Sequence, residues 1–353
     1  MINKMNKELY IFGAGASKSA AQMPLGAELV WDYVNDCGTF FQMENGKALQ
    51  SDIEEKKNEF VHFGEFLEIA GKIYPELSDE KEKWLKGMED AVMYFPPFLS
   101  SENKKYFFDE MLAISAKNKD EIAVKKIKNA IYAHIADKSR YQNDKTIYLD
   151  FLKFKISVNV TIISLNFDAL IKEDYEENVC IDYMVDFHQF IANRWYKKFV
   201  NCFPLLKLHG SIDWGWCKEC GSVILNGPWV NSDSYKGIEC QNCKNSIEPF
   251  IVVPFENAEK YPEWFAKLWK QAKIELSTSD TIYFIGYSIP EYDHDMLHLL
   301  KSSISENAKI EIVDPQAGIV KNKLLKLGLK SENITANNTG FREYLENINV
   351  LKS

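Results

Sequence analysis

Four cysteines form the clearest chemical motif of the sequence. Cys217 and Cys220 make one Cys-x-x-Cys pair, and Cys240 and Cys243 make a second pair after nineteen intervening residues. Two short turns that each offer two thiolates are typical of structural zinc, because four sulfur ligands complete its tetrahedral coordination. The alternatives are a ribbon that has lost its metal, or two redox pairs. We expect a structural zinc ribbon.

A histidine precedes this motif in the stretch 205-LLKLHGSIDWGWCKEC-220. Because four cysteines already fill the coordination sphere of zinc, His209 is not needed as a metal ligand. It ends an apolar run, and Gly210 leaves room beside it. Histidine titrates near neutral pH, which suits a general base. A core histidine with a satisfied hydrogen bond is the plainer alternative.

A glycine-rich turn follows the first apolar run of the chain. Its small residues would let backbone N–H groups approach a phosphate at a helix N-terminus. Lys18 stands where the dinucleotide-binding fingerprint has its third glycine, so a tight turn that packs a strand on a helix is the alternative. The turn consists of Gly13, Ala14, Gly15, Ala16 and Ser17.

Two further polar residues lie at the end of the apolar run 158-VNVTIISLN-166: Asn166 is its last residue, and Asp168 follows two positions later. Asn166 and Asp168 stand two apart, so in an extended chain their side chains point the same way. Asp168 could instead cap a helix expected over residues 169–175. Asn166 lies further from that helix and is the better site candidate.

The stretch 285-IGYSIPEYDHDM-296 is rich in acidic residues. It reads as a polar loop that enters a helix, with Asp293 or Asp295 as the helix cap. His294 and His298 would share one helix face and could bind a metal together, but no third ligand is evident.

The elements that would position these residues alternate along the chain. Helical segments over 262–277 and 293–306 separate several of the apolar runs, which predicts a parallel sheet with right-handed crossovers. Ligands of such sheets bind at the carboxyl ends of the strands, where the polar residues lie. The predicted strands are a run ending at residue 12, then 158–166, 203–210, 250–255, 281–288 and 309–314.

A long segment with helical rather than strand patterning interrupts this alternation. In 121-EIAVKKIKNAIYAHIADKSR-140 the apolar residues recur at helical spacing. We therefore expect an α/β fold, with a Rossmann-like parallel sheet covered by helices on both faces, a helical insertion and a small four-cysteine zinc ribbon. The expected parts are 1–40, 156–213 and 249–353 for the Rossmann-like domain, 41–155 for the insertion and 214–248 for the ribbon.

Charge and cysteine usage narrow the class of protein. The net charge of −9 gives no support for nucleic-acid binding. The sequence has neither a membrane span nor the features of a signal peptide, which predicts a cytoplasmic protein.

Seven cysteines, an odd number, argue against a disulfide framework. We expect Cys37, Cys180 and Cys202 to be free, buried thiols.

The order of these motifs resembles the sirtuin superfamily. Gly-Ala-Gly-Ala-Ser, Leu-Asn-Phe-Asp, Leu-His-Gly-Ser, two Cys-x-x-Cys pairs, Gly-Tyr-Ser and Val-Asp-Pro follow one another over most of the chain. Within the superfamily the sequence is most similar to the divergent bacterial branch, through Lys-Leu-His-Gly-Ser-Ile-Asp-Trp and Ile-Gly-Tyr-Ser-Ile-Pro-Glu-Tyr-Asp.

The resemblance implies a site for NAD⁺. His209 would be the catalytic histidine, and Asn166 and Asp168 would face the nicotinamide ribose. The glycine-rich turn would hold the pyrophosphate. The remaining contacts to phosphate, ribose and adenine would come from Gly286, Ser288, Asp314 and Phe341.

Departures from the family pattern favour NAD⁺ hydrolysis over deacylation. The deacetylases carry Gly-Ile-Pro-Asp-Phe-Arg, whereas this chain reads 23-MPLGAEL-29, and their Gln-Asn-Ile-Asp is Leu-Asn-Phe-Asp here. We expect a gated NAD⁺ glycohydrolase of antiphage defence, which depletes NAD⁺ as a homo-oligomer or with a partner ATPase or sensor. The alternatives are an NAD-dependent lysine deacylase, or an inactive NAD- or ADP-ribose-binding sensor or scaffold.

Overall fold

The computed structural model describes most of the two ends of the chain and part of its middle. The described residues are 6–23, 64–89, 111, 114–115, 117–141, 146–155, 159–171, 179–187, 189–190, 202–225, 235, 237–253 and 261–351. Cys37 lies outside them. So does the end of the expected helix at 169–175.

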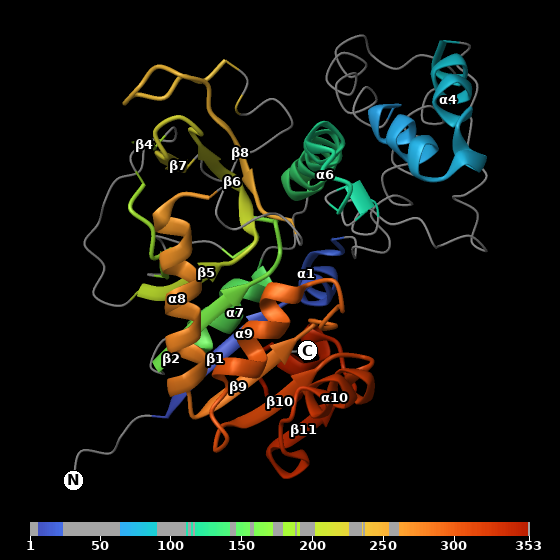
Figure 1. The fold of residues 1–353 in the computed structure, drawn as a ribbon. Helices are drawn as coiled ribbons and strands as arrows, with labels where there is room; N and C mark the ends of the chain where they lie inside the picture. The colour runs from blue at the N-terminus through green and yellow to red at the C-terminus, as the bar shows by residue number, and fades with distance from the viewer. Residues whose placement is uncertain are drawn as a thin grey trace.

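A seven-stranded sheet forms the centre of the fold (Figure 1). All of its strand pairs are parallel, in the order β11-β10-β9-β1-β2-β5-β3. Apolar residues of the central strands are buried on both faces, which explains why these runs are continuously apolar. The strands are β1 (Lys7–Phe12), β2 (Asn159–Ser164), β3 (Cys180–Asp182), β5 (Cys202–Lys207), β9 (Thr281–Ile285), β10 (Lys309–Val313) and β11 (Ile334–Asn337).

Helices cover this sheet. Aromatic residues of α7 and α11 pack on Phe12: the ring centroids of Phe151 and Phe341 lie 5.7 and 5.3 Å from that of Phe12. Leu9 and Ile11, which alternate with Phe12 along the strand, are also fully buried, and α8 packs on β1, β5 and α9. The helices are α1 (Ala14–Ala21), α7 (Thr146–Lys155), α8 (Glu263–Thr278), α9 (His294–Ser303), α10 (Ala317–Lys326) and α11 (Phe341–Asn347), with a 3₁₀ turn η5 (Ser331–Asn333).

The predicted α/β class with a parallel sheet is thus confirmed. The chain departs from β1 toward β2, β5 and β3 on one side, and returns to build β9, β10 and β11 on the other. The direction of sheet growth therefore reverses between β1 and β9. In open parallel sheets the ligand crevice lies at such a switch point, outside the carboxyl ends of the strands.

A second sheet of four strands holds the cysteine pairs. Its order is β4-β7-β6-β8, and β6 runs antiparallel to both β7 and β8. The run 250–255 was expected in the parallel sheet, but its first two residues belong to β8 of this second sheet, and residues 254–255 lie outside the described part of the chain. Its apolar character reflects an aromatic cluster between this sheet and α8, in which the rings of Phe250 and Trp264 are 4.8 Å apart. The strands are β4 (Gln189–Phe190), β6 (Gly210–Trp216), β7 (Val223–Leu225) and β8 (Glu248–Ile251).

The middle of the chain is helical where the structure describes it. It contains η2 (Pro75–Leu77), α4 (Glu80–Glu89) and α6 (Glu121–Tyr141). Ile127 and Ile131 of α6 are buried, whereas Ile122 is 72% exposed although its spacing suggested the apolar face. The helix lies beside the small sheet (Figure 1), where Lys125 Nζ is 3.0 Å from Glu248 Oε1.

One expectation about the cysteines is wrong. Cys180 of β3 and Cys202 of β5 are paired in register and form a disulfide bond. The odd cysteine count could not show this pair, because only the parallel pairing of β3 with β5 makes residues 22 apart in sequence direct neighbours.

Within the described part of the chain, none of the helices combines the length and the apolar character that a membrane span requires.

The switch point requires glycine, and a substitution there should be costly. A Cβ on Gly286 would lie 2.1 Å from the backbone nitrogen of Ala16, and its φ is +60°. We expect Gly286→Ala to lower the free energy of unfolding by about 2–4 kcal/mol, measured by urea denaturation. The matched control is Gly318→Ala in α10, where nothing lies within 4 Å of the added Cβ. That variant should gain about 0.5–1 kcal/mol. Equal stability of the two variants would contradict the contact.

Candidate functional site

The glycine-rich turn meets the loop after β9 backbone to backbone. Gly13 N donates to the Ile285 carbonyl at 3.0 Å, and Gly15 N donates to the Gly286 carbonyl at 2.9 Å. A Cβ on Gly13 would lie 2.6 Å from the Gly286 oxygen, so this approach explains the glycine. The two N–H groups serve the fold in this conformation. Phosphate binding by the turn remains a prediction.

Asn166 lies directly beside this turn and is buried. Its Nδ2 donates to the Gly13 carbonyl at 3.0 Å and to Ser17 Oγ at 2.8 Å. Because a carbonyl can only accept, the atom facing Gly13 must be the amide nitrogen, and both of its hydrogens are used. The atom that Asn166 can present to a ligand is therefore its carbonyl oxygen, an acceptor for a hydroxyl group or a water molecule.

The hydroxyl of Ser17 extends this contact into the core. Ser17 Oγ lies 3.1 Å from Tyr148 OH on α7. Burial raises the pKa of Tyr148 well above its usual value, and the charge of Asp168 adds to the effect, so this phenol stays neutral. The turn after β1, the loop after β2 and α7 are thus joined by one chain of polar contacts.

Asp168 is held by its neighbours rather than by a helix. Its Oδ1 accepts from Leu170 N at 3.1 Å, and residues 169–171 are not helical, so the alternative that Asp168 caps a helix starting at residue 169 is wrong. Its carbonyl accepts from the buried Lys207 Nζ. Burial lowers the pKa of Lys207, while the charges of Asp168 and Asp213 oppose that shift. Lys207 belongs to none of the sequence motifs, but a lysine inside the apolar run LLKLHG is a signal that could indicate a buried polar contact.

His209 follows β5 and is only 8% exposed. Its Nδ1 lies 3.2 Å from the carbonyl of Leu165, the residue before Asn166. Since that carbonyl can only accept, Nδ1 carries a hydrogen, and in the neutral ring the lone pair is on Nε2. Gly210 allows β8 to pack close by, because a Cβ there would lie 2.2 Å from the Phe250 carbonyl oxygen.

Nε2 of His209 faces a carboxylate. Asp293 Oδ2 lies 3.6 Å from Nε2 and accepts from Tyr287 OH at 2.8 Å. Burial alone would raise the pKa of Asp293, but His209 and the Tyr287 hydroxyl outweigh it and hold that pKa below its usual value. Asp293 is the N-cap residue of α9, as its sequence position suggested. The sequence did not indicate its contact with the histidine.

The other candidate residues lie at or near the same edge of the sheet. Gly286 and Ser288 follow β9. Ser288 is exposed, and its carbonyl accepts a hydrogen bond from Lys323 Nζ at 2.8 Å. Asp314 follows β10, where its Oδ1 accepts from Gln316 N at 2.7 Å. Phe341 instead is buried in the core. The edge thus brings together the glycine turn, Asn166, His209, Gly286 and Asp293.

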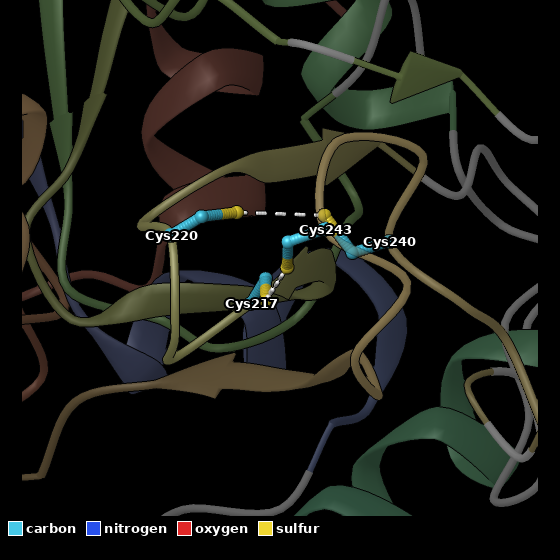
Figure 2. Close-up of side chains that lie close together, drawn as sticks. All are labelled: Cys217, Cys220, Cys240 and Cys243. Atoms are coloured by element: carbon cyan, nitrogen blue, oxygen red, sulfur yellow. Dashed lines mark hydrogen bonds between the residues drawn. The ribbon is translucent and has the colours of Figure 1, made fainter.

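The four predicted metal ligands converge in the small module (Figure 2). Their Sγ atoms all lie within 4.8 Å of one another, with 3.3 Å between Cys217 and Cys243 and 3.5 Å between Cys220 and Cys240. Tetrahedral zinc with bonds of about 2.3 Å places its sulfurs about 3.8 Å apart. The cluster fits one zinc ion. Such a closed four-sulfur site leaves no coordination position for substrate, so its role is structural.

The two knuckles have the same backbone geometry. Gly221 N donates to the Cys217 carbonyl at 2.9 Å, and Lys244 N donates to the Cys240 carbonyl at 2.8 Å. Gly221 and Lys244 both have positive φ, of 72° and 63°. Trp264 Nε1 donates to the Gly221 carbonyl at 2.9 Å, which ties the first knuckle to α8.

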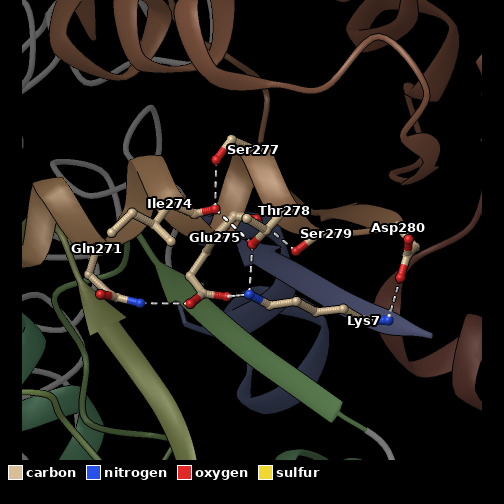
Figure 3. A network of polar contacts seen from close by, with 8 residues as sticks. All are labelled: Lys7, Gln271, Ile274, Glu275, Ser277, Thr278, Ser279 and Asp280. Carbon is tan, nitrogen blue, oxygen red and sulfur yellow. Dashed lines mark hydrogen bonds and ion pairs between the residues drawn. The ribbon is translucent and has the colours of Figure 1, made fainter. Parts of the chain in front are cut away.

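A different polar cluster occupies the amino end of β1 (Figure 3). Lys7 Nζ pairs with Glu275 Oε2 at 2.8 Å and donates to Thr278 Oγ1 at 2.7 Å, while Lys7 N donates to Asp280 Oδ2 at 2.9 Å. These contacts attach the end of α8 to the sheet edge opposite the carboxyl ends. They support the fold and are not part of the candidate site.

Comparison with known proteins gives matches among solved structures only. No protein-family model matches the sequence, and neither does any curated protein. A Sir2 homologue mutant in complex with 2′-O-acetyl-ADP-ribose matches with 13% identity and a TM-score of 0.43, over 93% of this chain and 96% of that one. Sir2 in complex with the inhibitor EX-527, 2′-O-acetyl-ADP-ribose and deacetylated p53 peptide matches with 14% identity and a TM-score of 0.42, over 99% and 96%.

A Sir2 homologue in complex with NAD matches with 14% identity and a TM-score of 0.38, over 64% of this chain and 79% of that one. These descriptions name the family that the order of motifs resembles. The identities and TM-scores are low, and the fold is defined here by the strand order and pairing of the chain itself.

The cysteine cluster gives a direct test of the metal site. Purified protein should contain about one zinc per chain, and Cys217→Ser should lose most of it and become less soluble, because three thiolates leave the coordination incomplete. Mass spectrometry of metal content measures the result. Cys202→Ser, which alters a cysteine outside the cluster, is the control and should keep its zinc. Zinc retained in full by Cys217→Ser would exclude the four-cysteine site.

Proposed function

We propose that the chain is an NAD⁺ glycohydrolase, which cleaves NAD⁺ to nicotinamide and ADP-ribose at the carboxyl edge of the sheet. The observation that carries the proposal is the state of His209. A ring with hydrogen-bonded Nδ1 and a lone pair on Nε2 is the form that a general base needs. The ring contacts the carbonyl of Leu165, the residue before Asn166, and Asn166 lies against the turn at the switch point, where parallel sheets bind their ligands.

The proposed reaction needs one general base and no strong general acid. The bond between nicotinamide and ribose breaks through a transition state with oxocarbenium character, and nicotinamide leaves as a neutral group. A water molecule then adds to the ribose carbon. His209 Nε2 takes a proton from this water, directly or through a ribose hydroxyl, and releases it to solvent. The Asn166 carbonyl oxygen would orient the water or the hydroxyl.

The remaining candidate residues have binding roles in this proposal. Residues 13–17 and Gly286 would lie along the pyrophosphate, and Ser288 would contact phosphate or ribose. Asp314 would accept from the adenosine ribose, and Asp168 would fix the loop that carries Asn166. Phe341 is buried between β1 and α7, so it would shape the adenine side of the site from within the core.

We further propose that the activity is gated and serves antiphage defence by NAD⁺ depletion in the cytoplasm. Uncontrolled NAD⁺ cleavage would harm the host cell. The helical segment 41–155 is the proposed contact for a second copy of the chain or for a partner ATPase or sensor. Its helix α6 contacts β8 through Lys125 and Glu248. Val252, which directly follows β8, donates its N–H to the His209 carbonyl at 2.9 Å.

Lysine deacylation is the second candidate, and the four-cysteine ribbon favours it, since the resembled deacetylases have one. An acyl-lysine oxygen would then replace water as the nucleophile. A catalytically silent sensor of NAD⁺ or ADP-ribose is the third. The products formed from NAD⁺ distinguish the three.

The central prediction is equimolar nicotinamide and ADP-ribose from NAD⁺ without any peptide, measured by liquid chromatography and mass spectrometry across a range of protein concentrations. His209→Ala and Asn166→Ala should each lower the rate by about 10²–10⁴-fold while the protein stays folded. The matched control is His298→Ala, which alters an exposed histidine of α9 and should leave the rate unchanged.

Other outcomes would redirect the proposal. Nicotinamide release only with an acetylated peptide would identify a deacylase. Tight ADP-ribose binding without turnover would identify a sensor. Wild-type cleavage by His209→Ala would rule out the histidine as the base.

A further inference from the structure

The contact between His209 and Asp293 goes beyond the site that the sequence indicates. Asp293 is 2% exposed, and it reaches the histidine from the loop between β9 and α9. The carbonyl of Leu165 approaches the other side of the ring, from the loop after β2. Two segments that are far apart in sequence therefore flank the imidazole: Leu165 is hydrogen-bonded to Nδ1, and Asp293 lies 3.6 Å from Nε2.

The Asp293 carboxylate cannot be stable in such a buried position without partners, because a buried charge must be paired or hydrogen-bonded. Tyr287 OH supplies one hydrogen bond at 2.8 Å. The N-terminus of α9 adds a favourable dipole. A protonated His209 supplies the opposite charge at 3.6 Å from the same oxygen. The carboxylate in turn favours the protonated state of the ring.

The separation of 3.6 Å is longer than a hydrogen bond. Nε2 therefore lies near the negative charge, and in the proposed reaction it would take its proton from a hydroxyl or a water. The imidazolium formed in that step would lie beside a carboxylate that is already ionised. Its proton leaves to solvent after the ADP-ribose product forms.

We infer that Asp293 is the positioning residue of His209: it orients the ring and stabilises the imidazolium, while Tyr287 fixes the carboxylate. The catalytic consequence rests on the proposed function, whereas the electrostatic link between the two side chains does not. Tyr287 faces Asp293 from the loop after β9, and Tyr292 is the next phenol near Tyr287. The loop after β2 contributes the Leu165 carbonyl and the Phe167 ring, 6.2 Å from the imidazole.

The variant Asp293→Asn removes the negative charge of the side chain and keeps its size and shape. The asparagine oxygen can still accept from Tyr287, so the buried hydrogen bond survives while the negative charge is lost. Asp295→Asn is the matched control, because it makes the same change at an exposed carboxylate two residues further along. Asp293→Glu restores the charge and tests for rescue.

Two measurements on the full chain read the effect. Histidine-labelled protein gives the NMR titration of His209, assigned by its loss in His209→Asn. The midpoint should move to lower pH by about one unit or more in Asp293→Asn, because an opposite charge at this range favours the protonated ring. NAD⁺ kinetics should show kcat lowered by about 10- to 100-fold with KM changed less than about twofold, a part of what a general base supplies. Asp295→Asn should change neither, and Asp293→Glu should recover part of the rate.

The two readouts keep the failures apart. An unchanged His209 midpoint in Asp293→Asn would overturn the inference, whatever the enzyme does with NAD⁺. A shifted midpoint with unchanged kcat would overturn the positioning role in the reaction. If the wild-type chain does not cleave NAD⁺, the proposed function fails, and the titration alone decides whether Asp293 controls the histidine.

Discussion

The site depends on a close backbone contact between two turns at the centre of the sheet. The turn after β1 donates two backbone hydrogen bonds to the carbonyls of Ile285 and Gly286, and a side chain at Gly13 or Gly286 would prevent this approach. This contact closes the switch point, where the two halves of the sheet diverge. It also fixes the Gly13 carbonyl to which Asn166 donates, and so sets the orientation of the amide. The positions of the polar residues at the carboxyl edge therefore depend on this contact.

The same edge joins the main sheet to the small module. β5 ends at Lys207, and β6 of the small sheet begins at Gly210, so the turn that carries His209 is the direct connection between the two sheets. The zinc knuckles lie at the far end of β6 and are tied to α8 by Trp264. The cysteine cluster therefore stabilises the module that starts at His209. Under the proposed function, metal and histidine have separate roles, the first structural and the second chemical.

Much of this arrangement could be predicted from the sequence, because buried parallel strands are continuously apolar and their polar tips must meet at one edge. The four-cysteine spacing likewise indicated its cluster. What failed were features that depend on pairing across the fold. The disulfide between Cys180 and Cys202 arises from strand register, and the run at 250–255 is apolar because of an aromatic cluster in the small sheet. Asp293 and His209 are 84 residues apart in the sequence, so no local sequence pattern indicates their contact.

The central claim is that the carboxyl edge of β1, β2, β5 and β9 binds a dinucleotide. Hydrogen–deuterium exchange of the full chain, with and without saturating ADP-ribose, tests it most directly. The account predicts slower exchange in peptides that span residues 13–17, 164–168 and 205–210, with little change in the zinc knuckles. Protection confined to the small module or to α4 and α6, or no protection at saturation, would contradict it.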